Sequence, residues 1–235
     1  MFWAYSRLFV ALILLTIAVI TAERALASDR ESLTLERYQA GVKAYQAGRY
    51  NQAISDFTAT LKSKPGLAEA HFNRGLSYEQ LGDQEMAVSD YTRAIELKPR
   101  YAMAYQNRGL VRWQLGQQAA ALADLDKTIE IKPEYAKGYF NRGTLKARRG
   151  EYQAALEDFS HALDLKPDYA LAYFNRAAAN SERGQIAAVL TDLERARKHF
   201  AAQGEQAAAE RTAQLIEEHQ AKMFGGRRPQ APAQP

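Results

Sequence analysis

The sequence contains no cysteine, which excludes disulfide bonds, thiolate metal sites and thiol nucleophiles. Its histidines (His71, His161, His199 and His219) are scattered and show neither HExxH nor any other metal-ligand spacing. Glycine-rich phosphate-binding loops and the GxSxG motif of serine hydrolases are also absent. We therefore expect a protein that is not an enzyme and that holds no metal and no cofactor.

The chain also lacks a large excess of charge of one sign. Its 31 Lys and Arg residues face 27 Asp and Glu residues, which gives a formal net charge of +4. Domains that bind nucleic acid usually concentrate basic residues on one face, whereas here they are spread along the chain. Helical-repeat proteins can bind RNA, but the balanced charge and the export signal described next argue against a nucleic-acid partner.

Long apolar runs are absent except at the N-terminus, where residues 8–20 contain no charged residue. This run is shorter than the roughly 20 residues that a transmembrane helix needs. Residues 25–27, before Ser28, have the small-x-small pattern that signal peptidase accepts. We therefore expect residues 1–27 to be a cleaved signal peptide and the protein to be periplasmic or secreted.

An uncleaved anchor is the alternative for the same segment. Glu23 and Arg24 are unusual so close to a cleavage site. If the segment is retained, the protein is anchored in the inner membrane, and this is the one membrane contact that we expect.

Prolines are few, but four of the seven follow one another at a constant interval, at Pro65, Pro99, Pro133 and Pro167. Two rows of glycine have the same period, at Gly48, Gly82, Gly116, Gly150 and Gly184 and at Gly41, Gly75, Gly109 and Gly143. Three rows in phase predict an internal repeat with a period of about 34 residues.

Each repeat is expected to form a helix, a tight turn and a second helix. In the repeat at residues 68–101, Ala87, Tyr91 and Ala94 follow helical spacing. Gly82 can adopt the positive φ that a sharp turn needs, and Pro99 cannot continue the second helix. We expect five repeats, at residues 34–67, 68–101, 102–135, 136–169 and 170–203, then a capping helix at 205–222 and a disordered tail at 223–235.

These rows resemble the tetratricopeptide repeat (TPR) family. Besides the glycines and prolines, a row of small residues (Ala53, Ala87, Ala121 and Ala155) and a row of bulky residues (Phe57, Tyr91, Leu125 and Phe159) match the second helix of that repeat. The resemblance implies an all-α, right-handed α-solenoid of five TPR helix pairs plus a C-terminal capping helix, of an exported bacterial type. It does not imply a partner, because the family binds many unrelated ones.

Asparagine recurs at the sixth position of repeats two to five, at Asn73, Asn107, Asn141 and Asn175. In the family, the first helices line the concave surface, and asparagines at this position hold the backbone of a ligand. A side-chain amide has both a donor and an acceptor, so each could pair with one peptide group of an extended chain. We predict that this row binds peptide; the alternative is that the asparagines cap or bridge neighbouring helices.

Aromatic side chains accompany this row. Phe72, Phe140 and Phe174 occupy the fifth position of their repeats, and Trp113 lies further along the first helix of repeat three. We predict that they anchor apolar side chains of a ligand, with ordinary helix packing as the alternative. The carboxylate clamp of the family is matched at Asn107 only in part, so we do not expect recognition of chaperone tails.

Arginine follows each of these asparagines, at Arg74, Arg108, Arg142 and Arg176. Aspartates recur in the second helices, at Asp56, Asp90, Asp124, Asp158 and Asp192. Because a buried charge needs a partner, we predict ion pairs between repeats, each aspartate with the arginine of the next repeat: Asp56–Arg74, Asp90–Arg108, Asp124–Arg142 and Asp158–Arg176. This leaves Asp192 for Arg211. Pairing within a repeat, as in Arg74 with Asp90, and binding of an acidic ligand are the alternatives.

Taken together, these features predict a non-catalytic scaffold or adaptor of the bacterial cell envelope. It would hold an extended peptide or a partner protein in its concave groove. The alternative is a structural subunit that self-associates, or joins a membrane complex, through its convex or end faces.

Overall fold

The computed structural model describes residues 21, 23–24 and 29–223. The predicted signal peptide lies almost entirely outside these residues, as does the predicted tail from residue 224 onward. The questions of cleavage and of tail disorder therefore stay predictions.

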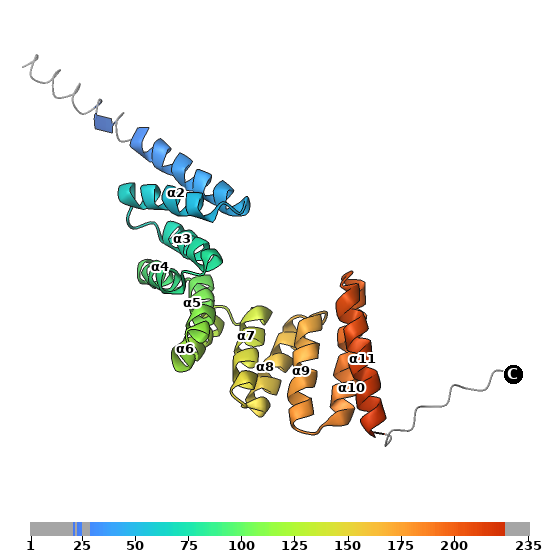
Figure 1. The fold of residues 1–235 in the computed structure, drawn as a ribbon. Helices are drawn as coiled ribbons and strands as arrows, with labels where there is room; N and C mark the ends of the chain where they lie inside the picture. Colours follow the sequence, from blue (N-terminus) through green and yellow to red (C-terminus); the bar gives the residue numbers. More distant parts are fainter. Residues whose placement is uncertain (1–20, 22, 25–28, 224–235) are drawn as a thin grey trace, which may run out of the picture. The chain divides into compact units, whose positions relative to one another are not determined.

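All regular secondary structure among the described residues is helical (Figure 1). Residues 29–46 form the first helix of repeat one. The helices that follow are α2 (Tyr50–Ser63), α3 (Ala68–Leu81), α4 (Gln84–Leu97), α5 (Ala102–Gln114), α6 (Gln118–Ile131), α7 (Ala136–Arg148), α8 (Tyr152–Leu165), α9 (Ala170–Glu182), α10 (Ile186–Ala202) and α11 (Gln206–Met223). They form five helix pairs and a capping helix, which confirms the predicted all-α solenoid class.

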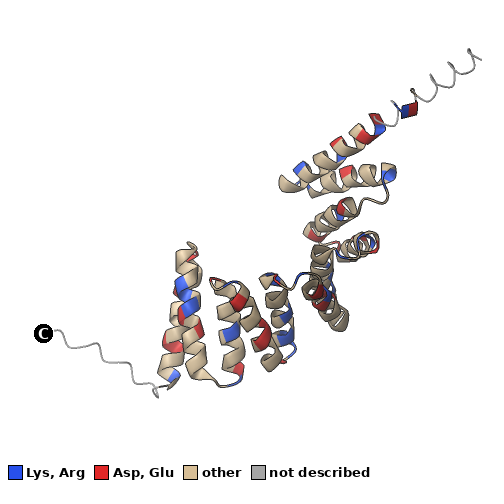
Figure 2. Cartoon of the chain, turned by 180° about the vertical axis from the view of Figure 1, so that it is seen from behind, with Lys and Arg blue, Asp and Glu red and all other residues tan. Residues whose placement is uncertain are grey.

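The chain divides into two compact parts, the N-terminal segment (Met1–Ala104) and the C-terminal segment (Tyr105–Pro235). The division falls inside α5, so repeats one and two belong to the N-terminal segment and repeats four and five to the C-terminal segment. Each segment is described by itself. Lys and Arg are interspersed with Asp and Glu along the helices of both (Figure 2).

The turn between the two helices of a repeat depends on glycine. In repeat two, Gly82 ends α3 with φ of 82°, a conformation that is strained for residues with a Cβ atom. The Gly82 and Asp83 amides donate to carbonyls in the last turn of α3, at 3.1 and 2.9 Å. This arrangement satisfies the end of α3 and reverses the chain within two residues, because α4 begins at Gln84.

Close packing of the two helices requires a second glycine. A Cβ atom on Gly75 would lie 2.8 Å from Tyr91 Cε1, which is closer than carbon atoms can approach. Tyr91 is fully buried, as are its counterparts Phe57, Leu125 and Phe159. The rows of small and bulky residues found in the sequence are therefore the core of the repeats.

Helix α11 covers the end of repeat five. Its buried residues are Ala209, Thr212 and Ile216. Ala209 packs with Phe200 of α10, and Ile216 packs with Val189. None of the helices in the part of the chain that the structure describes combines the length and hydropathy that a transmembrane helix requires.

Candidate peptide-binding surface

Two of the four asparagines tie neighbouring repeats together. Asn73 Nδ2 donates to the Tyr38 hydroxyl at 2.9 Å, across repeats two and one. Asn175 Nδ2 donates to Thr144 Oγ1 at 3.2 Å, across repeats five and four. At these two positions, the structure favours the interpretation that the asparagines bridge helices.

Asn141 differs from these two. Its side chain is 7% exposed, and its Nδ2 atom has no hydrogen-bond partner among the residues that the structure describes. Gln106 is 2% exposed, and its Oε1 atom also has no hydrogen-bond partner among the described residues. Leaving a buried donor or acceptor without a partner costs about 1–3 kcal/mol, so both groups are unusual in a folded protein.

The positions of Gln106 and Asn141 are equivalent by the repeat to those of Tyr38 and Asn73, since both lie two repeats further along the chain. Tyr38 and Asn73 form a hydrogen bond between repeats one and two. At the equivalent positions, the Asn141 Nδ2 donor and the Gln106 Oε1 acceptor have no partners among the described residues. Gln106 instead directs its Nε2 atom to Asn107 Oδ1, at 3.5 Å. One donor and one acceptor are what a single peptide group requires. Because both atoms are covered, the two amide side chains must rotate before a peptide can reach them.

The aromatic residues of the first helices take part in the core. The Phe72 ring centroid lies 5.6 Å from that of Tyr91, and Phe140 lies 6.1 Å from Phe159. Phe174 lies 6.4 Å from Phe200, and Trp113 packs against the cluster of Ala121, Leu125 and Leu145. The structure therefore favours helix packing for Phe72, Trp113, Phe140 and Phe174, although each stays half-buried.

Arginine and aspartate form ion pairs within each of repeats two to five, so the predicted pairing between repeats is wrong. Each arginine uses Nε and Nη2 to hold both carboxylate oxygens. The two distances are 2.8 and 2.8 Å for Arg74–Asp90, 3.0 and 2.7 Å for Arg108–Asp124, 2.9 and 2.5 Å for Arg142–Asp158, and 2.9 and 2.7 Å for Arg176–Asp192. All four carboxylates are buried.

Symmetry about the turn explains this pairing. Arg74 lies eight residues before Gly82, and Asp90 lies eight residues after it. In two antiparallel helices, residues equally far from the turn face each other. The sequence therefore contained the signal for pairing within a repeat, and it recurs around Gly116, Gly150 and Gly184.

Arg74, Arg142 and Arg176 also reach the preceding repeat, through their remaining nitrogen. Arg74 Nη1 donates to Thr58 Oγ1 at 3.0 Å. Arg142 Nη1 donates to Asp126 Oδ1 at 2.7 Å, and Arg176 Nη1 to Ser160 Oγ at 3.1 Å. The predicted link between repeats thus exists, but it runs through these acceptors and not through the buried aspartates.

Repeat one departs from this scheme because Ala40 stands where an arginine would pair with Asp56. Asp56 is half-buried and accepts from Gln52 Nε2 at 3.1 Å. Asp192, which we predicted to be left for Arg211, is held by Arg176. The aspartate of the row that has no arginine at the equivalent position is therefore the first one and not the last.

A second side chain joins three of the buried aspartates. Arg112 Nη1 lies 2.8 Å from Asp124, and Lys146 Nζ lies 2.8 Å from Asp158. His71 Nδ1 lies 3.3 Å from Asp90. The sequence analysis missed these partners, although Arg112 and Lys146 each follow the paired arginine by one helical turn.

The arginines are poorly placed to hold an acidic ligand. In Arg142, hydrogen bonding to Asp158 raises the pKa, so the group stays charged. Its Nε, Nη1 and Nη2 atoms all donate to carboxylates of the chain. A ligand would have to displace these partners, which disfavours the acidic-ligand alternative.

Profiles of known families recognise the repeats directly. A tetratricopeptide repeat profile matches residues 68–101, a second matches residues 85–136, and a TPR repeat profile matches residues 145–184. The chain is a tetratricopeptide repeat protein. Its repeat fold is usually non-catalytic. Among the described residues of this TPR protein, no group of three or more His, Asp or Glu side chains is placed to hold a metal ion.

Solved structures share the fold of this TPR protein. A crystal structure of MamA protein superposes with a TM-score of 0.66 at 22% identity and covers 74% of this chain and 96% of its own. MamA 41-end from Desulfovibrio magneticus RS-1 gives 0.61 at 19% identity, covering 74% and 95%. YrrB, described as a TPR protein with an unusual peptide-binding site, gives 0.63 at 18% identity, covering 82% and 97%. No curated protein shows significant sequence similarity to the chain.

Proposed function

We propose that this TPR protein is a non-catalytic scaffold of the bacterial cell envelope that binds an extended peptide or a partner protein through its first helices. The observation that carries the proposal is the pair of buried amide atoms, Asn141 Nδ2 and Gln106 Oε1, that lack partners among the described residues. Asn141 offers a bound peptide one donor, and Gln106 offers it one acceptor. Binding would then supply the hydrogen bonds that the free chain leaves unmade.

Two further points support this proposal. YrrB has a similar fold and a peptide-binding site, so the architecture is compatible with peptide recognition. The envelope location is supported by the features of residues 1–27, namely an apolar run followed by a small-x-small motif.

The asparagine row provides a matched pair of variants. Asn107→Ala/Asn141→Ala removes the unpartnered Asn141 Nδ2 donor and the Asn107 Oδ1 atom that accepts from Gln106, and we expect it to lose the partner without a loss of stability. Asn73→Ala/Asn175→Ala removes two bonds between repeats. We expect it to keep the partner but to lose about 1–3 kcal/mol of stability, at about 0.5–1.5 kcal/mol for each hydrogen bond.

The measurement is capture of proteins from a bacterial envelope extract by the tagged full-length chain and by both variants, with identification by mass spectrometry. Urea denaturation of each variant gives the stability. A protein that the wild type and Asn73→Ala/Asn175→Ala capture, and Asn107→Ala/Asn141→Ala does not, supports the proposal. Equal capture by all three would contradict it and would point to the convex or end faces, as in a self-associating or membrane-complex subunit.

A further inference from the structure

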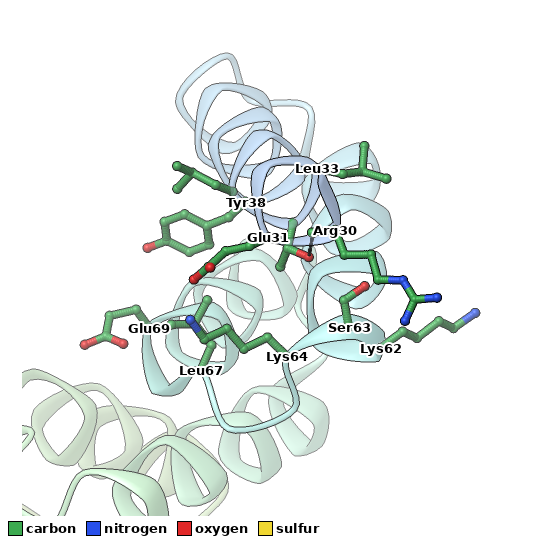
Figure 3. Close-up of a pocket in the computed structure, with 11 residues that line it drawn as sticks. Arg30, Glu31, Leu33, Tyr38, Lys62, Ser63, Lys64, Leu67 and Glu69 are labelled. Atoms are coloured by element: carbon green, nitrogen blue, oxygen red, sulfur yellow. Dashed lines mark hydrogen bonds between the residues drawn. The ribbon is translucent and has the colours of Figure 1, made fainter. Parts of the chain in front are cut away.

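A surface cleft of about 880 Å³ lies in repeat one (Figure 3). It is formed by the start of the helix at residues 29–46, the end of α2 and the start of α3. Apolar side chains, among them Leu33, Leu35, Tyr38 and Leu67, line it beside charged ones. Leu33 and Leu35 are 48% and 56% exposed, so the cleft presents apolar surface to water.

The cleft lies where repeat one lacks a ring that later repeats possess. Leu67 occupies the position of Tyr101 and Tyr169, which lie one and three repeats further along. Tyr101 packs on Phe72, and Tyr169 packs on Phe140, each with ring centroids 4.9 Å apart. Tyr38 holds the position of Phe72 and Phe140. Repeat one therefore has the ring of the first helix but lacks the tyrosine ring that packs on it in repeats two and four.

In repeats two and four, a lysine covers this tyrosine ring. Lys98 Nζ lies 4.8 Å from the centroid of Tyr101, and Lys166 Nζ lies 5.1 Å from that of Tyr169. Lys64 holds the equivalent position in repeat one and lines the cleft. The two groups that enclose a tyrosine ring in repeats two and four are thus both present, with a leucine at the position of the ring.

The charges at the rim also indicate what fits. Arg30, Lys62 and Lys64 line the cleft together with Glu31 and Glu69, and Glu69 is already engaged by Lys98 at 2.9 Å. The rim therefore has an excess of positive charge. Lys98 binds the carboxylate of Glu69 while it covers the Tyr101 ring. A lysine at this position can therefore contact an aromatic ring and an acidic group together.

We propose that this cleft binds an aromatic side chain of a peptide with an acidic residue next to it. The ring packs between Tyr38 and Lys64, as the chain's own tyrosines do in repeats two and four, and the acidic residue meets the basic rim. This inference rests on the proposed function, because it states what a bound partner presents. It concerns a different surface from the asparagine row.

The test uses the blocked peptide acetyl-Gly-Glu-Phe-Glu-Gly-amide and its alanine analogue, titrated into the isotope-labelled full-length chain and followed by NMR. Leu67→Tyr restores the ring and fills the cleft, and we expect it to weaken binding about tenfold or more, since an aromatic pair and a cation–π contact are lost. The alanine analogue should lose as much on the wild type. Met86→Ala is the control, because Met86 is exposed and lies outside the cleft, and it should bind the aromatic peptide as the wild type does.

Leu67→Phe serves as a second variant that fills the cleft, should Leu67→Tyr fail to fold by its thermal melt. Equal affinity of the wild type and the filled variants would overturn the inference. So would equal affinity for the two peptides, or no binding to the wild type, as expected if another part of the chain or a second copy fills the cleft. Failure of the proposed function has a different signature. Partner capture would then not respond to Asn107→Ala/Asn141→Ala, while the peptide titration would still respond to Leu67→Tyr.

Discussion

Replacing Arg176 with alanine is expected to destabilise the C-terminal segment by about 3–5 kcal/mol, the range found when one partner of a buried ion pair is removed. Asp192 is 3% exposed. Without the arginine, its hydrogen-bond partner among the described side chains is Asn180, whose Nδ2 atom is 3.4 Å away. The change also removes the bond to Ser160 of the preceding repeat.

Arg108→Ala is the comparison that makes this prediction specific. It removes the same kind of pair, but Asp124 keeps Arg112 at 2.8 Å, so we expect a clearly smaller loss. Urea denaturation followed by circular dichroism gives both values. A cost near zero for Arg176→Ala, or a larger one for Arg108→Ala, would show that the pairs do not stabilise the repeats as described.

The double variant Arg176→Leu/Asp192→Leu separates the two contributions. Removing both charges leaves no unpaired carboxylate, and replacing a buried pair with apolar residues is often neutral or stabilising. We therefore expect the double variant to recover most of the stability lost in Arg176→Ala. If it is as unstable as Arg176→Ala, the loss comes from packing and from the bond to Ser160.

Truncation of Phe159 to alanine is expected to destabilise the chain by about 3–5 kcal/mol, the usual range for a phenylalanine in a core. The ring is fully buried and packs with Ala155 and with Ala179 of the next repeat. The change therefore opens a cavity at the contact between repeats four and five. Denaturation of the full-length chain measures the loss, and a value below about 1 kcal/mol would contradict this description of the core.

Gly143 lies against the same ring and provides the control. A Cβ atom there would lie 2.9 Å from Phe159 Cε1, so Gly143→Ala alone should cost about 1–3 kcal/mol through overpacking. In the double variant Gly143→Ala/Phe159→Ala, the added methyl group enters the space that the ring leaves. We expect the double variant to be more stable than the sum of the single changes predicts. Strict additivity would mean that the glycine is not needed for the close approach of the ring.

Much of the fold could be predicted because it depends on local chemistry that repeats. Gly82 sets the turn and Pro99 the end of a helix within a few residues. Their regular recurrence along the chain shows that repeats one to four use the same turn and the same helix end. The core follows equally directly, since the close approach at Gly75 requires glycine opposite a bulky ring. Patterns of this kind are visible in one sequence.

The partners of the polar groups were harder to predict. The sequence identifies the aspartates and arginines, but two spacings can join them, and only the symmetry about Gly82 distinguishes the two. The bonds from Arg74 to Thr58 and from Asn73 to Tyr38 depend on how one repeat lies against the next. The pattern within a repeat does not contain that information.

Differences between equivalent positions were the least predictable. Leu67 can be seen in the sequence to replace a tyrosine, but the structure is needed to show that a cleft opens there. The lack of partners for Asn141 Nδ2 and Gln106 Oε1 among the described residues likewise depends on the packing of two specific helices.

The hydrogen bond from an arginine to the preceding repeat affects how repeats can be added to the chain during evolution. Repeat four takes its acceptor from Asp126 of repeat three and supplies Ser160 to Arg176 of repeat five. A tandem duplication of residues 136–169 would therefore place a new arginine beside a serine that can accept from it, and every junction would keep its link. Gene duplication can lengthen the array one repeat at a time in this way, without any compensating substitution at the joints.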